Sequence, residues 1–195
     1  EVEKGLLKPM LKGEDISRYK NLQNKYFVIF PYILENQKAK PMSEDFIKEN
    51  YPKGYEYLKA NEEFLRGREK GKMDKDGWFL YIYPKSLDLV DVKKFVVPDI
   101  TFGIQITIDN FGYCVKNGGY GMIIKDEYKN QSMYYLTLLN SSLLWFYLKN
   151  IGTELRGGYF RFKTAYLEPF PLPKLKNLEQ QEPFIQKADL MLELN

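Results

Sequence analysis

The chain has 195 residues, a formal net charge of +3 and 44% apolar residues. It is therefore long enough to bury a sizeable core in one domain, or in one domain with an appendage. It contains no histidine, which excludes Ser-His-Asp triads and histidine-ligated metals within this chain. Its one cysteine, Cys114, excludes an internal disulfide and a multi-cysteine metal site. Cys114 lies in a strand-like run, so we expect a buried thiol.

Two features bear on where the chain works. The first residues are charged, so no signal peptide is predicted, and the apolar stretch 133–148 is too short and too polar to span a membrane. The sequence begins at Glu1 rather than at methionine. We therefore expect a piece of a longer, cytoplasmic protein with no membrane partner.

In chain order, the first half predicts two strands separated by helices. Residues 26–30 are β-branched and aromatic and predict a strand. Ser43 can cap a short helix at 44–49, and a longer helix follows from about 53 to 67. The aromatic run 78–83 predicts a second strand.

The second half predicts a sheet followed by helices. Alternating apolar residues predict an antiparallel group of strands at 94–97, 104–108, 111–115 and 120–124. A helical region begins at Ser132, breaks at 140–142 and ends at Gly152, and a last helix covers 180–194. This order predicts an α+β fold with mainly antiparallel sheets, helices packed on them and a C-terminal helix.

A glycine pair, Gly157-Gly158, opens an alternating aromatic and basic run. As a strand, this run places Phe160 and Phe162 on one apolar face. The opposite face carries Tyr159, Arg161 and Lys163. We expect the apolar face to anchor the strand to the core.

The densest basic cluster holds four cations in seven residues, Arg66, Arg68, Lys70 and Lys72. Such a cluster could bind DNA phosphates, or one of its arginines could hydrogen-bond to the major-groove edge of guanine. It could equally be a solvated helix end, because cations favour the C-terminal turn of a helix. The residues alone leave both interpretations open.

No catalytic or cofactor motif stands out. One pattern resembles the Asp and Glu-x-Lys signature of magnesium-dependent nucleases. It consists of Asp99, Glu127 and Lys129. Short patterns of this kind also arise by chance in a chain with 28% charged residues. The glycine-rich pieces match no phosphate-binding pattern. We therefore predict no catalytic, cofactor or metal residues, and keep a small nuclease as an alternative.

Five short segments, in order, are similar to motifs of one known family. They are an opening segment at 7–19, a Tyr-Leu, Arg-Gly-Arg and Trp-x-x-Tyr block at looser spacing at 57–83, a Leu-Leu-Asn-Ser-x-Leu helix within 135–144, a closing strand with a Pro-Leu-Pro exit at 157–173, and a Glu-x-Gln helix start at 179–185. Together they resemble the TaqI-like C-terminal specificity domain of restriction-modification enzymes, which is related to type I specificity subunits.

The resemblance implies a target-recognition domain for double-stranded DNA at 1–173 and a C-terminal helical segment at 174–195. It also implies a separate N-terminal domain that methylates adenine with S-adenosylmethionine, in a parent protein with or without endonuclease activity. Lysines and arginines would fix the register of the DNA on its phosphates while loops and strand edges read the major groove. Beside the basic cluster, the contact candidates are Lys12, Arg18, Lys85, Arg161 and Lys163. The alternative is a structural module that docks another subunit through the C-terminal helix, and the oligomeric state stays open.

Overall fold

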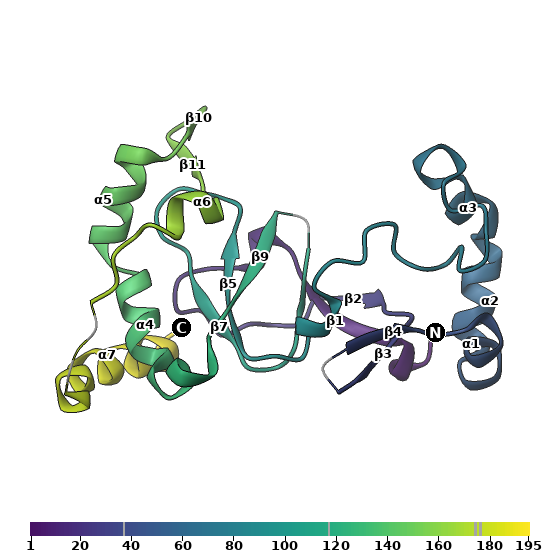
Figure 1. Ribbon diagram of the computed structural model, residues 1–195, viewed down its shortest axis with the longest axis horizontal. Coiled ribbons are helices and arrows are strands. Elements are labelled where there is room, and N and C mark those ends of the chain that lie inside the picture. Colours follow the sequence, from purple (N-terminus) through teal and green to yellow (C-terminus); the bar gives the residue numbers. More distant parts are fainter. Residues whose placement is uncertain (37, 117, 174, 176) are drawn as a thin grey trace. The chain divides into compact units, whose positions relative to one another are not determined.

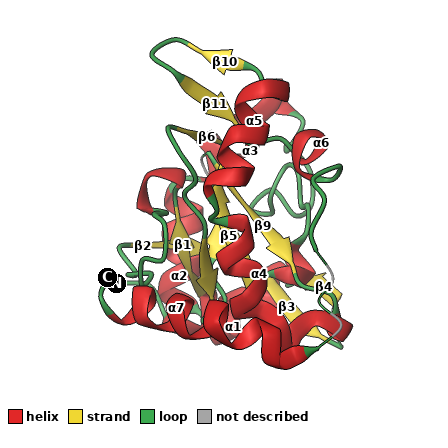
Figure 2. Cartoon of the chain, turned by 90° about the vertical axis from the view of Figure 1, so that its left-hand side faces the viewer, coloured by secondary structure: helices red, strands yellow, loops and turns green. Residues whose placement is uncertain are grey.

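A computed structural model describes residues 1–36, 38–116, 118–173, 175 and 177–195 (Figure 1). Positions 174 and 176, at the start of the expected C-terminal segment, lie outside the described residues. The chain forms two compact units, residues 1–9 with 26–91 and residues 10–25 with 92–195. Both contain helices and short strands, so the fold is α+β, as predicted (Figure 2). Within the described ranges, no helix is long and apolar enough to cross a membrane.

The first unit combines short strands with three consecutive helices. Its elements are the start of β1 (Leu7–Leu11), β2 (Tyr26–Ile29), β3 (Tyr32–Glu35), β4 (Lys38–Pro41), α1 (Glu44–Asn50), α2 (Pro52–Ala60) and α3 (Glu62–Gly71), with 3-10 turns at Lys4–Leu6 and Leu87–Leu89. Ser43 caps α1 as predicted, because its hydroxyl accepts from Phe46 N at 3.1 Å. The long helix expected at 53–67 is instead two helices that meet at Asn61.

The core of the first unit forms around the indole of Trp78, which is 1% exposed and packs with Leu6, Ile47, Leu58 and Phe79. The prediction of a strand at 78–83 is wrong, since this segment runs through turns and bends. Its backbone groups find side-chain partners in place of a strand ladder.

The second unit is built on a three-stranded antiparallel sheet. β5 (Lys94–Pro98) lies between β7 (Thr107–Asp109) and β9 (Gly119–Ile123), and Lys94 faces Asp109 in the β5–β7 register. A second sheet joins β6 (Ile100–Thr101), β11 (Tyr159–Arg161) and β10 (Glu154–Leu155), and the end of β1 pairs in parallel with β8 (Cys114–Val115). The buried thiol of Cys114 agrees with the prediction.

The strand order differs from the one expected for 104–115. Residues 104–106 make no strand, and the segment after Asp109 does not return along β7. The Asp109 carboxylate accepts hydrogen bonds from the backbone N–H groups of Phe111, Gly112 and Tyr113 at 2.8–3.0 Å. These bonds turn the chain away from β7, so that only 114–115 pairs, and with β1.

Helices complete the second unit. They are α4 (Ser132–Leu139), α5 (Ser142–Ile151), α6 (Thr164–Leu167) and α7 (Glu182–Glu193), with 3-10 turns at Gly13–Asp15, Asp126–Gln131 and Leu178–Gln181. The predicted break is confirmed, because α4 ends at Asn140 and the Ser141 hydroxyl caps α5. The predicted last helix is confirmed as α7, which packs against α4. Leu136, Leu144 and Phe162 are fully buried between these elements.

Candidate nucleic-acid interface

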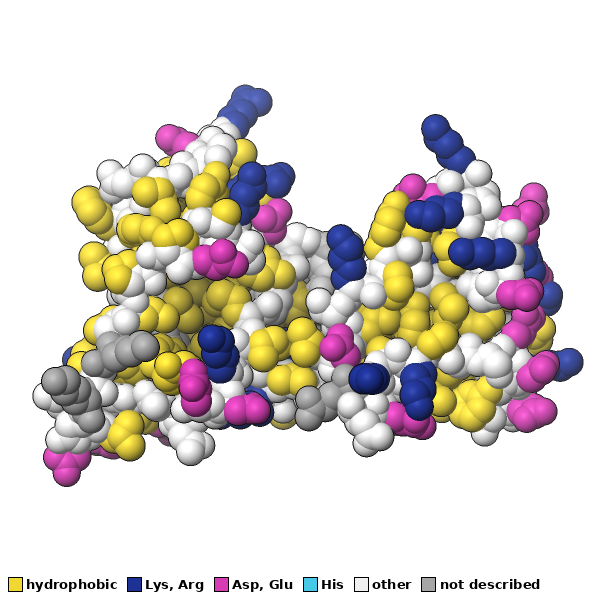
Figure 3. Space-filling view, in the orientation of Figure 1, with side chains coloured by type: hydrophobic (Ala, Val, Ile, Leu, Met, Phe, Trp, Pro, Cys, Tyr) yellow, Lys and Arg dark blue, Asp and Glu magenta, His cyan; other side chains and the backbone are white. Residues whose placement is uncertain are grey.

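The nine cations predicted to contact DNA belong to both units. The first unit carries Arg66, Arg68, Lys70, Lys72 and Lys85, and the second carries Lys12, Arg18, Arg161 and Lys163. Figure 3 shows basic side chains over the α3 end of the first unit and over the β10–β11 end of the second. Their assignment as DNA contacts stays a prediction. Their local geometry separates them into cations with partners inside the chain and exposed cations.

The guanidinium of Arg68 is occupied by backbone carbonyl groups. Its Nε donates to Leu65 O at 2.8 Å, and one terminal nitrogen donates to Trp78 O at 2.6 Å and Leu80 O at 3.0 Å. Burial lowers the pKa of Arg68 below its usual value, although an arginine remains protonated. Arg68 therefore links the end of α3 to the irregular segment 78–80 that replaces the expected strand.

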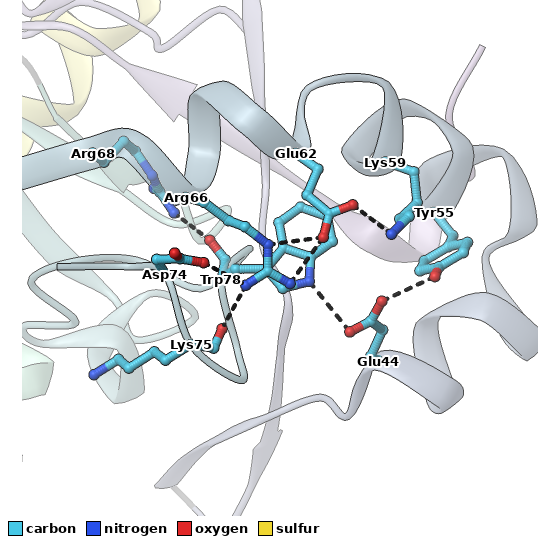
Figure 4. Close-up of polar contacts among 9 residues, drawn as sticks. All are labelled: Glu44, Tyr55, Lys59, Glu62, Arg66, Arg68, Asp74, Lys75 and Trp78. Carbon is cyan, nitrogen blue, oxygen red and sulfur yellow. Dashed lines mark hydrogen bonds and ion pairs between the residues drawn. The ribbon is translucent and has the colours of Figure 1, made fainter. Parts of the chain in front are cut away.

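Arg66 also has partners inside the first unit (Figure 4). Its guanidinium donates to Glu62 at 2.8 Å and to Asp74 at 3.2 Å, and lies 5.4 Å from the centre of the Trp78 ring. Hydrogen bonds from Lys59 and then from Arg66 lower the pKa of the Glu62 carboxyl. The bond to Glu62 likewise raises the pKa of Arg66. This network stabilises the surface above the Trp78 indole.

Three lysines of the first unit point to solvent instead. Lys70, Lys72 and Lys85 are exposed. The Lys72 ammonium lies 5.1 Å from the centre of the exposed Tyr83 ring. Lys70 sits in a kink of α3 where the backbone leaves the helical region from Arg68 to Lys70. These lysines can meet a phosphate without first breaking a buried contact.

In the second unit, β10 and β11 form a hairpin that begins the predicted aromatic and basic run (Figure 2). Gly157 and Gly158 have φ of +84° and +78°, which a side chain would disfavour, so the pair serves the turn. Phe160 and Phe162 are buried as predicted, whereas Tyr159 is 47% exposed. Its ring packs against the exposed ring of Phe102 at 5.9 Å.

The two cations at the end of this hairpin and just beyond it differ in their surroundings. Arg161 faces Asp99 across 3.9 Å with 43% of its side chain exposed. Lys163 is exposed, and its ammonium lies 6.0 Å from the centre of the Tyr166 ring. Near the start of the second unit, the exposed Arg18 stacks on Tyr19, while Lys12 lies 3.7 Å from Glu14.

The nuclease alternative gains no geometric support. Glu127 and Lys129 share a 3-10 turn, in which the Lys129 ammonium pairs with Asp126 at 2.6 Å. Asp99 faces Arg161. Across the described residues, no group of three or more carboxylate or thiol side chains is placed to hold a metal ion.

Sequence reasoning missed two exposed aromatic side chains beside the cations. Phe64 on α3 is 74% exposed and lines an open hollow with Gly67 and Arg68, and Phe102 is 64% exposed. The sequence does carry a signal for Phe64, because Glu62, Glu63 and Arg66 surround it on α3. Nothing in the sequence around Phe102 marks it as exposed.

Comparisons with known proteins agree on one family. The profile of the TaqI-like C-terminal specificity domain matches residues 8–172. Similar proteins include the type II restriction enzyme and methyltransferase RM.Eco57I of Escherichia coli, 27% identical over 89% of this chain and 19% of that protein. The type II methyltransferases M.BanIII of Aneurinibacillus aneurinilyticus and M.BstVI of Geobacillus stearothermophilus are 25% and 23% identical, each over 93% of this chain and 31% of the relative. The chain therefore spans about a fifth to a third of the length of these relatives.

Proposed function

Because the chain belongs to the TaqI-like C-terminal specificity domain family, we propose that it recognises a specific double-stranded DNA sequence for a restriction-modification enzyme. The observation that carries this proposal is the family match over residues 8–172, which covers most of each unit. Exposed cations on each unit support it, because phosphate neutralisation supplies much of the affinity of DNA-binding proteins.

The methyl transfer itself belongs, in this proposal, to another domain of the parent protein. Two of the three relatives described above are named methyltransferases and the third a restriction enzyme and methyltransferase, and all extend well beyond the matched part. We propose that the parent methylates adenine, that its methyltransferase domain binds S-adenosylmethionine, and that it works in the cytoplasm. The chain described here would then supply sequence readout to that domain.

Within the chain, the exposed lysines are the best phosphate contacts. Lys72 and Lys85 of the first unit and Lys163 of the second can approach the DNA backbone directly. Arg66 and Arg68 hold other parts of the first unit together, so they would act mainly by fixing the surface that carries these lysines. Backbone contacts set register and orientation, and base-edge contacts set sequence preference.

The test is selection of duplexes from a random pool by the 195-residue chain at moderate salt. A recognition domain should enrich one short motif, and the logarithm of its affinity should fall linearly with the logarithm of salt concentration. Replacing Lys72 and Lys163 together by glutamate should weaken binding to all duplexes, whereas the same change at the ion-paired Lys40 should not. A pool that stays random, with affinity independent of salt, would instead favour the protein-docking alternative.

A further inference from the structure

Two neighbouring residues at the end of α3 adopt a backbone conformation that side chains disfavour. Glu69 has φ 51° and ψ 46°, and Lys70 has φ 59° and ψ 40°. Gly71 follows at φ 84°. Three successive left-handed residues are unusual, and two of them carry a Cβ, which crowds the following carbonyl oxygen. Such outliers persist only where the surroundings impose them.

The chain on both sides of the pair is fixed. Before it, Arg68 is extended and its guanidinium is bound to the carbonyls of Leu65, Trp78 and Leu80. After it, Lys72 N donates to Glu69 O at 3.3 Å and Asp74 N donates to Gly71 O at 2.9 Å. The backbone at 69–71 is therefore held as a defined tip.

The side chains of Glu69 and Lys70 make no contact that would stabilise the tip in the part of the chain that the structure describes. Glu69 and Lys70 are both exposed, and neither side chain has a hydrogen-bond or ion-pair partner among the described residues. Glycine would adopt the same conformation without crowding. Local folding therefore does not explain why a carboxylate and an ammonium group stand at these two positions.

A carboxylate beside several lysines is informative for a surface that meets DNA. It repels phosphates, so it contributes nothing to backbone contact. It can, however, accept a hydrogen bond from the N4 amino group of cytosine in the major groove, while a lysine can donate to O6 and N7 of guanine. An acidic and a basic side chain at adjacent positions of the tip thus offer one partner for each base of a G·C pair.

We propose that Glu69 and Lys70 are sequence-reading residues of this domain, with Lys70 contacting guanine and Glu69 contacting cytosine of a G·C pair in the major groove. This proposal rests on the proposed DNA-recognition function. The strained tip supplies the fixed geometry, and Arg68 is the positioning residue that holds it.

The experiment combines a stability measurement with duplex selection. Glu69→Gly and Lys70→Gly should each raise the melting temperature, because glycine relieves the left-handed strain. The same variants should lose roughly tenfold to hundredfold discrimination at one base pair of the selected motif. Glu69→Gln keeps the shape of the side chain and removes its charge, so it should weaken discrimination at that base pair without relieving the left-handed strain. Asn36→Gly, at another left-handed position in the first unit with φ 48°, is the control that should leave the motif unchanged.

Each outcome decides something different. Glycine variants that keep the full motif would overturn the proposal, as would a loss of affinity that is equal for all sequences. Glycine variants with a lower melting temperature would show that the side chains stabilise the tip, and would also overturn it. If the unaltered chain selects no motif at all, the DNA-recognition function itself fails, independently of the roles of Glu69 and Lys70.

Discussion

The ammonium nitrogen of Lys94 lies 2.7 Å from a carboxylate oxygen of Asp109, and the two side chains are only 5% and 0% exposed. The residues face each other in the register of β5 and β7. The same carboxylate accepts the three backbone N–H groups that turn the chain after β7. One side chain thus joins the central sheet of the second unit to the turn that leads to β8.

Removing this carboxylate should strongly destabilise the second unit. Asp109→Ala removes the carboxylate that pairs with the buried Lys94 ammonium and frees three N–H groups, so we expect a loss of about 3–5 kcal/mol in the free energy of unfolding. Urea unfolding followed by tyrosine and tryptophan fluorescence measures it. The exposed pair between Lys8 and Asp91 is the matched control, and Asp91→Ala should cost less than about 1 kcal/mol. Equal losses in the two variants would refute the buried role of Asp109.

Alkaline pH should weaken the second unit through Tyr120. Its hydroxyl donates to Phe162 O at 2.6 Å. Burial, and to a smaller extent the Asp99 carboxylate, raises the pKa of Tyr120 well above its ordinary value. As pH rises, the unfolded chain therefore releases this proton first, near pH 10. The stability contributed by the neutral phenol is fully present below that pH and is lost as pH climbs toward the folded-state pKa.

Urea unfolding between pH 8 and 11 tests this linkage. Tyr120→Phe should lose about 1 kcal/mol at pH 8, because the carbonyl of Phe162 loses its donor. Above pH 10 its stability should then fall less steeply than that of the unaltered chain. Tyr159→Phe removes a hydroxyl from a side chain that is 47% exposed, and should leave the slope unchanged. Parallel curves for the Tyr120 variant and the unaltered chain would contradict the assignment.

Arg68 should matter for folding more than for phosphate contact. Arg68→Met removes the donors to Trp78 O and Leu80 O, and we expect about 1–3 kcal/mol lower stability. Arg68→Lys keeps the charge but cannot reproduce the guanidinium geometry, so it should be destabilised nearly as much. Below the melting temperature, Arg68→Met should bind DNA with an unchanged salt slope. A shallower slope in a fully stable variant would return Arg68 to the DNA contacts predicted from the sequence.

Local signals in the sequence were sufficient for much of the fold. The caps at Ser43 and Ser141 use hydroxyls next to the helix that they start, so a short window of sequence reveals them. The run 78–83 has strong strand propensity, yet its carbonyls are taken by Arg68 and the backbone N–H of Tyr81 by the hydroxyl of Tyr32. Those partners lie too far away in sequence for a propensity argument to find.

In the candidate site too, local sequence reveals some features, and contacts between distant residues determine the others. The basic cluster at 66–72 is visible in the sequence, but which cations are occupied depends on tertiary contacts. Arg66 meets Asp74 and the Trp78 ring only because the chain folds back after α3. The left-handed backbone of Glu69 and Lys70 also has no sequence marker, since neither residue type favours that conformation.

The exposed lysines should act additively through phosphates. Lys85→Ala in the first unit and Lys163→Ala in the second each remove an exposed ammonium group, so each should lower the magnitude of the salt slope by about 0.9. The loss should be the same for the selected motif and for random duplexes, because phosphate contacts carry no sequence information. Fluorescence anisotropy titrations between 50 and 200 mM salt, roughly the range over which such contacts lose most of their affinity, give both quantities. Lys40→Ala, which removes a lysine paired with Glu35, should change neither slope nor affinity. A base-specific loss at Lys85 or Lys163 would move that residue from the phosphate contacts to the readout of sequence.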